Sequence, residues 1–162
     1  MNLLASSPEW VIWLLIALLA AATVQDAVQL RISNLITAAV VLLGIAAMGL
    51  SGFQPIVWQN SLAFAAVLLA GAILFSQGML GGGDVKLLAA VALWVDARAA
   101  PMLVLAILIC GGLLAVLILF LRVALPERLS GRVATLRPKA GIPYGIAISV
   151  GTLMALAAFR HW

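Results

Sequence analysis

Charged residues are scarce in this chain of 162 residues, making up 9% of it against 66% for hydrophobic residues. Soluble domains carry about 25% charged residues, so the composition excludes a soluble globular protein and indicates an integral membrane protein. Cysteine and histidine are also scarce, with one of each, Cys110 and His161. A single cysteine cannot form an internal disulfide or a cysteine-rich zinc site. We therefore expect no metal and no cofactor.

Six long apolar runs occupy most of the chain, at residues 10–24, 35–50, 56–75, 85–95, 102–121 and 142–159. A membrane-spanning helix needs roughly 17–25 residues, which most of these runs reach alone or with their flanks. We predict an all-α bundle of six transmembrane helices that forms a single membrane-embedded domain over residues 1–162. The fourth run is the exception, because its length gives only about 16 Å of helix against a hydrocarbon core of about 30 Å.

Lysine and arginine fall mainly on one side of the predicted bundle. The first, third and fifth connections carry seven of the nine, namely Arg31, Lys86, Arg122, Arg128, Arg132, Arg137 and Lys139. The positive-inside rule places these connections in the cytoplasm and both termini on the outer face. The five tryptophans lie at run ends assigned to the outer face, where aromatic side chains favour the interface. The net charge of +4 is thus assigned to topology and lipid contact, not to nucleic acid.

Two of the five acidic residues are expected at one level of the membrane. Asp26 follows the first apolar run and Asp84 precedes the fourth, so both should lie at the cytoplasmic face. Asp84 stands behind three glycines, Gly81, Gly82 and Gly83. If the short fourth helix leaves Asp84 below the lipid surface, it is a functional candidate, as ionisable groups at that depth are. Each aspartate also has a simpler interpretation, as a helix cap for Asp84 and a loop residue for Asp26.

Three stretches of the chain resemble the motifs of a known family. GGGDVKLLAA, residues 81–90, is similar to the GxGD motif of type IV prepilin peptidases, which are membrane aspartyl proteases. DAVQLRISN, residues 26–34, resembles the family's first-aspartate segment, with Ser33 where proline is usual. GIPYGIAISVG, residues 141–151, resembles its Pro-Tyr-Gly segment in the last span. The chain is similar to the short, peptidase-only branch associated with tight-adherence (Flp-type) pili, which lacks the methyltransferase insert with its zinc-binding cysteines.

The resemblance implies an aspartic-type endopeptidase in which Asp26 and Asp84 form the catalytic pair. Its substrates would be prepilins and pseudopilins, cut behind a short basic leader at the cytoplasmic face of the bacterial inner membrane. These substrates and membrane lipid are the expected partners. Glycines admit close backbone approach, so the three glycines are expected to let substrate reach Asp84. Lys86 and Tyr144 are further cleft candidates, although Lys86 also fits a topology marker and Tyr144 an interfacial anchor.

The positions of the two aspartates at helix ends suggest which carboxylate acts as the base and which as the acid. Two close carboxylates do not both ionise easily, so one acts as base and the protonated one as acid. Asp84 begins a helix, where the macrodipole favours negative charge, whereas Asp26 is expected after a helix end. Our hypothesis is that Asp84 is the ionised base at rest and Asp26 its protonated partner.

Three other interpretations use the same residues. A different GxGD-type protease would cut within a transmembrane substrate. A small proton-coupled transporter would use the aspartates as a relay, although the sequence has no inverted repeat with matched broken helices. A scaffold subunit of a secretion machine would not be catalytic. Carboxyl groups that share a site favour hydrolysis, and aspartates that face opposite sides of the bundle favour a relay or a scaffold.

Overall fold

The computed structural model describes residues 1–52, 55–124 and 141–160, and the regular secondary structure within these ranges is entirely helical. The elements are α1 (Leu3–Ser6), α2 (Glu9–Gln29), α3 (Asn34–Leu50), the short 3₁₀ helix η1 (Pro55–Val57), α4 (Trp58–Ser76), α5 (Gly82–Ala92), α6 (Ala100–Ala124) and α8 (Tyr144–Arg160). Some residues used for the topology prediction lie outside the described ranges, namely Arg128, Arg132, Arg137, Lys139 and Trp162.

The six longer helices coincide with the six apolar runs. Three of them, α2, α4 and α6, are long and apolar enough to cross a membrane, and α3 and α8 are shorter apolar helices. The described residues thus form an all-α membrane protein. Helix α5 has 11 residues, as short as its apolar run. Within the described ranges, α1, a single turn before α2, is a helix that the sequence did not predict.

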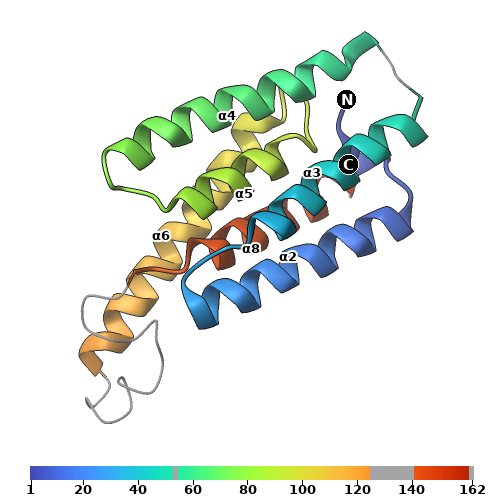
Figure 1. The fold of residues 1–162 in the computed structure, drawn as a ribbon. Helices are drawn as coiled ribbons and strands as arrows, with labels where there is room; N and C mark the ends of the chain where they lie inside the picture. The colour runs from blue at the N-terminus through green and yellow to red at the C-terminus, as the bar shows by residue number, and fades with distance from the viewer. Residues whose placement is uncertain (53–54, 125–140, 161–162) are drawn as a thin grey trace.

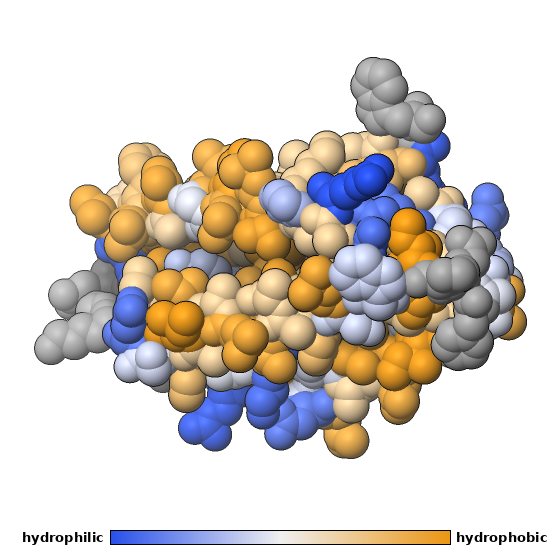
Figure 2. All heavy atoms as spheres, turned by 90° about the horizontal axis from the view of Figure 1, so that it is seen from above, coloured by the Kyte–Doolittle hydropathy of each residue, from blue (hydrophilic) through white to orange (hydrophobic). Residues whose placement is uncertain are grey.

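Helix α5 lies inside the bundle, whereas the longest helix lies at its surface. Figure 1 shows α5 between α4 and the layer of α3 and α8, and it packs against all three. Its side chains at Leu87 and Val91 are fully buried. Helix α6 instead exposes large apolar side chains along its length, including Leu105, Leu113 and Phe120. Apolar residues also cover most of the face in Figure 2, as a lipid-facing surface requires.

Trp94 corrects part of the prediction about tryptophans. Its side chain is fully buried, and its Nε1–H donates to the carbonyl oxygen of Val40 at 3.3 Å. The Trp94 carbonyl accepts from the N–H of Leu3 at 2.9 Å, so α1 closes over this end of α5. An indole that packs inside the bundle cannot anchor it at a lipid interface. Three other tryptophans are exposed, namely Trp10, Trp13 and Trp58.

The end of α8 meets α1 at the same end of the bundle as Trp94. The Arg160 side chain donates from Nε to the carbonyl oxygen of Leu4 at 3.1 Å and from Nη2 to that of Ser7 at 2.7 Å. Helix α2 starts beside this cluster and runs away from it, and α5 starts at the far end. The last turn of α2 and the first turns of α5 and α8 therefore gather at the opposite end of the bundle (Figure 1).

Candidate active site

Asp26 lies in the last turn of α2, not after the helix as the sequence suggested. The helix continues to Gln29, where Leu30 ends it in the left-handed conformation and its N–H donates to the Asp26 carbonyl at 2.8 Å. The Asp26 residue is only 4% exposed. Its buried carboxylate has a hydrogen-bond partner: the backbone N–H of Gly145 donates to Oδ2 at 2.7 Å. This bond ties the end of α2 to the start of α8.

Asp84 is the third residue of α5, and Gly81 is the residue that caps this helix. The Asp84 carboxylate lies close to the backbone N–H of Gly81 and interacts with it, as acidic residues at this position commonly do. A Cβ on Gly81 would lie 2.7 Å from Asp84 Oδ2, so the carboxylate occupies the space of a side chain. Gly81, not Asp84, is thus the capping residue, and Asp84 lies in the first turn of α5, where the macrodipole favours its negative charge.

The two aspartates face one cavity. It has a volume of 230 Å³ and is lined by Asp26, Leu30, Arg31, Ile32, Gly81, Gly82, Gly83 and Asp84. The charges of the two carboxylates are close enough to interact. Residues separated by 58 positions are therefore brought together by the end of α2, the connection to α3 and the start of α5. A small polar cavity with two carboxylates can hold a water molecule between an acid and a base.

The glycines line this cavity, but two of them are also packed against the chain itself. A Cβ on Gly82 would lie 3.4 Å from the ring of Phe75. A Cβ on Gly83 would lie 3.2 Å from Ile32 Cβ and 3.3 Å from the Ile32 backbone nitrogen. The close approach at Gly83 is therefore between α5 and the connection that follows Asp26. This packing sets the two aspartates beside each other.

Two of the predicted cleft residues do not line the aspartate cavity. The Lys86 ammonium donates to Asn34 Oδ1 at 3.0 Å and faces a separate apolar groove between α3 and α4. Tyr144 begins α8, and a Cβ on Gly111 of α6 would lie 3.4 Å from its Cε1 atom. The Tyr144 ring therefore packs against α6. The lining of the aspartate cavity includes neither side chain.

The connection between α2 and α3 uses the serine that stands in place of the usual proline. The Ser33 N–H donates to Gln25 Oε1 at 2.7 Å, and its Oγ accepts from the N–H of Leu35 at 3.1 Å. Proline has no N–H, so it could not make the bond to Gln25. The departure from the family pattern therefore adds a hydrogen bond to this turn, which carries Ile32 to the aspartate cavity. Through the Oγ bond, Ser33 caps the start of α3.

Gly145 is the site residue that sequence reasoning missed. It lies in the GIPYGIAISVG stretch, where only the tyrosine was taken as a candidate. A hydrogen bond from a backbone N–H leaves no trace in side-chain chemistry, so the residue type gives no direct signal. The available signal was the glycine itself, because a helix-start glycine inside a family-like motif suggests a close backbone approach.

Four larger cavities along the described residues have no Asp or Glu in their lining. The 640 Å³ cavity between α4 and α6 is lined only by apolar residues, among them Ala66, Ala70 and Val104. Within the described ranges, no three His, Cys, Asp or Glu residues lie close enough to hold a metal ion. The paired aspartates are therefore the site on which a chemical function can be argued.

The fold and the site together identify the class of protein: a helical membrane protein that brings two carboxylates into one small cavity. The model of the type IV leader peptidase family matches residues 13–116, and the chain belongs to this family. This confirms the resemblance seen in the sequence and identifies a membrane peptidase. The matched range includes both aspartates and ends within α6, before Gly145. No curated protein and no solved structure matches the chain.

Proposed function

We propose that this chain is a prepilin leader peptidase that cuts Flp-type prepilins and pseudopilins with Asp26, Asp84 and a water molecule. The observation that carries the proposal is the shared cavity of the two carboxylates in a chain of the leader peptidase family. Aspartates that faced opposite sides of the bundle would have favoured a relay or a scaffold. No cofactor is needed, because two carboxylates supply both acid and base.

The pair acts as a unit that holds one proton. The ionised carboxylate takes a proton from water while the water oxygen attacks the scissile carbonyl carbon. The protonated carboxylate hydrogen-bonds to the carbonyl oxygen, and a proton then passes to the leaving amine as the C–N bond breaks. Asp84 lies in the first turn of α5, and Asp26 accepts an N–H from the first turn of α8. The N–H from α8 stabilises negative charge on Asp26 and so offsets part of the effect of the α2 end that assigned the base role to Asp84 alone.

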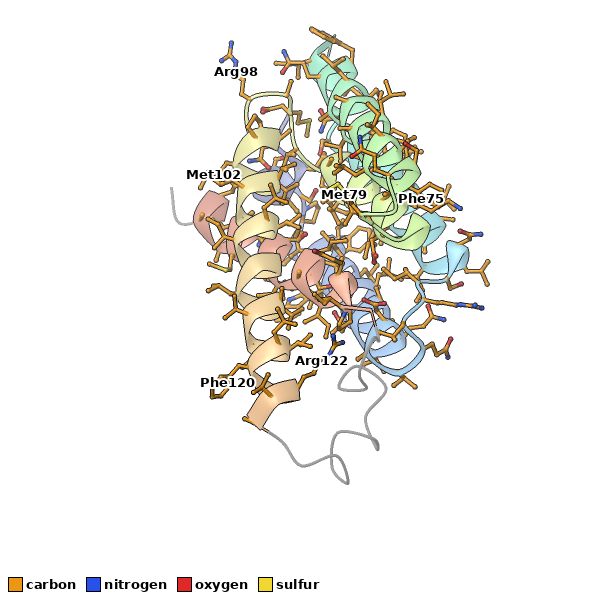
Figure 3. The ribbon with its side chains drawn as sticks, turned by 90° about the vertical axis from the view of Figure 1, so that its left-hand side faces the viewer. Phe75, Met79, Arg98, Met102, Phe120 and Arg122 are labelled. Atoms are coloured by element: carbon orange, nitrogen blue, oxygen red, sulfur yellow. The ribbon has the colours of Figure 1, made fainter. Side chains whose placement is uncertain are left out.

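The proposal places the cavity at the cytoplasmic face of the bacterial inner membrane, with six crossing helices and both termini in the periplasm. The distribution of basic residues supports this orientation. Arg31 lines the cavity, and Arg122 lies in the last turn of α6. Figure 3 shows Arg122 and Arg98 at opposite ends of α6. Arg160 lies with α1 at the end of the bundle away from the cavity. Substrate leaders in the cytoplasm would then meet the cavity directly.

Coexpression of the chain with a tagged Flp-type prepilin tests the proposal. We expect the precursor to be converted to mature pilin, with one new N-terminus directly after the leader. Cleavage inside the apolar segment of the pilin would instead indicate the other kind of GxGD protease. An uncut precursor together with aspartate-dependent proton uptake into vesicles would indicate the transporter.

Gly83→Val is expected to reduce leader cleavage while membrane insertion stays intact. The added side chain would push against Ile32 and move the connection that carries one wall of the cavity. Displacement of a catalytic group by about 1 Å can cost on the order of 100-fold in rate. The measurement is cleavage per molecule of inserted protein. Gly112→Val is the matched control, because a Cβ on this α6 glycine meets nothing within 4 Å. Equal cleavage by the two variants would refute the packing role of Gly83.

A further inference from the structure

We infer that Gly145 is a positioning residue for catalysis, because its backbone N–H holds the Asp26 carboxylate in place from a third helix, α8. The inference rests on the proposed catalytic role of Asp26. It extends the site beyond α2 and α5 and beyond the residues matched by the family model. Gly145 acts through Asp26 and has no contact with the substrate in this role.

The hydrogen bond is short, buried and made across the bundle. The nitrogen of Gly145 lies 2.7 Å from Asp26 Oδ2, and 119 positions separate the two residues in the chain. Helix α8 begins at Tyr144, so the Gly145 N–H is one of the first N–H groups that find no partner within a helix. Hydrogen bonds from backbone N–H groups to a carboxylate are among the strong ones. Helix α8 thus uses an unpaired donor to hold a catalytic carboxylate.

Any residue with a Cβ at this position would have to displace the Asp26 side chain. A Cβ on residue 145 would lie 2.8 Å from Asp26 Oδ2, 3.0 Å from its Cβ and 3.1 Å from its Cγ. The carboxylate therefore rests against the bare Cα of Gly145. One turn further along, the Ser149 hydroxyl donates to the carbonyl oxygen of Leu19 at 3.1 Å. This second bond holds α2 and α8 in the same relative position, so the first bond is set by the packing of both helices.

The bond determines which oxygen of Asp26 can act. Oδ2 is engaged by Gly145, and no residue bonds Oδ1 among the hydrogen bonds described for this side chain. Rotation of the carboxylate would break the bond, so the plane of the group is fixed. Oδ1 is then the oxygen available to water or to the shared proton. Fixing a reacting group in this way lowers the barrier, because little ordering is left to the chemical step.

The test compares purified full-length Gly145→Ala with the wild-type chain, using a purified Flp-type prepilin in detergent micelles as substrate. We expect kcat to fall on the order of 100-fold, because the new methyl group displaces the carboxylate. KM is expected to stay within about twofold of the wild-type value, since the substrate contacts are unchanged. Gly112→Ala, with open space around its Cβ, is expected to keep the wild-type kcat.

Gly151→Ala is the control that distinguishes a loss of Asp26 positioning from a general disturbance of α8 packing. A Cβ on this residue would press on the backbone of Ile107 in α6 and would not touch Asp26. We expect it to lower stability while kcat per folded molecule stays near the wild-type value. Wild-type kcat in folded Gly145→Ala, or an equal fall of kcat in Gly151→Ala, would overturn the inference. Both outcomes differ from failure of the proposed function, in which the wild-type chain would leave the prepilin uncut or Asp26→Asn would itself stay active.

A double-mutant cycle tests whether the effect of Gly145→Ala depends on the Asp26 carboxylate. A general structural role of Gly145 would give the same effect with and without that carboxylate. Gly145→Ala should lower the midpoint of thermal unfolding in the wild-type background, where its methyl group meets the carboxylate. The decrease should be smaller in the Asp26→Ala background, because Cγ and Oδ2 are then absent. An identical decrease in both backgrounds would mean that the carboxylate is not the group in contact, and the inference would be wrong.

Discussion

Asp84→Asn is expected to reduce leader cleavage by on the order of 10⁴-fold, and Asp26→Asn to do the same. Asparagine is close to aspartate in size, and at position 26 its carbonyl oxygen can still accept the N–H of Gly145. It cannot act as a base or carry the shared proton. Either change alone should cause the full loss, because residues that act as a unit are not additive. The measurement is the rate of conversion of a tagged prepilin, normalised to the amount of folded enzyme.

Asp96→Asn is the matched control for these two variants. Asp96 lies at the opposite end of the bundle, where its Oδ1 accepts from the N–H groups of Arg98 at 3.1 Å and Ala99 at 2.9 Å. Its Oδ2 lies 3.7 Å from the amino group of Met1. Cleavage should stay within about twofold of wild type, because ion pairs of this kind contribute little. A wild-type rate in either Asp26→Asn or Asp84→Asn would contradict the two-aspartate mechanism.

Gly151→Ala is expected to cost about 1–3 kcal/mol of stability, the usual range for overpacking. Its Cβ would lie 2.6 Å from Ile107 Cα and 2.8 Å from the Ile107 nitrogen. Backbone atoms cannot rotate away as a side chain can, so α6 and α8 would have to separate. Small residues at helix contacts of membrane proteins allow this kind of close approach.

The stability change is measured as the midpoint of thermal unfolding in one detergent. A chain of this size loses about 2–4 °C per kcal/mol, so the expected decrease is several degrees. Gly112→Ala on α6 supplies the comparison, because its Cβ points into open space. Equal midpoints for the two variants would show that α6 and α8 do not meet closely at residue 151.

The helices and the pairing of the aspartates could be predicted from the sequence, because both follow from apolar runs. Counting the runs placed Asp26 and Asp84 at the same level, and the structure puts both in one cavity. Apolar periodicity says nothing about a helix of one turn, so α1 was missed. Apolar periodicity also could not predict the burial of Trp94, because that residue is bonded to Leu3 and Val40, which are distant in the sequence.

The polar details of the site could not be predicted because they depend on backbone atoms. The bond from Gly145 joins residues 119 positions apart through an N–H that every non-proline residue carries. Lys86 and Tyr144 were chosen for their side chains, yet each is held elsewhere, by Asn34 and beside Gly111. Both residues belong to the motif stretches of the sequence, but neither lines the aspartate cavity. Contacts between distant helices decide which neighbours of a motif reach the site.

Incubation of the purified chain with a purified Flp-type prepilin in micelles, followed by mass spectrometry of the products, tests the central claim most directly. The account predicts two products, the intact leader and the mature pilin, whose masses sum to that of the precursor plus one water. It also predicts that Asp26→Asn and Asp84→Asn leave the precursor uncut. An unchanged precursor with the folded wild-type chain, or the same two products with either asparagine variant, would contradict it.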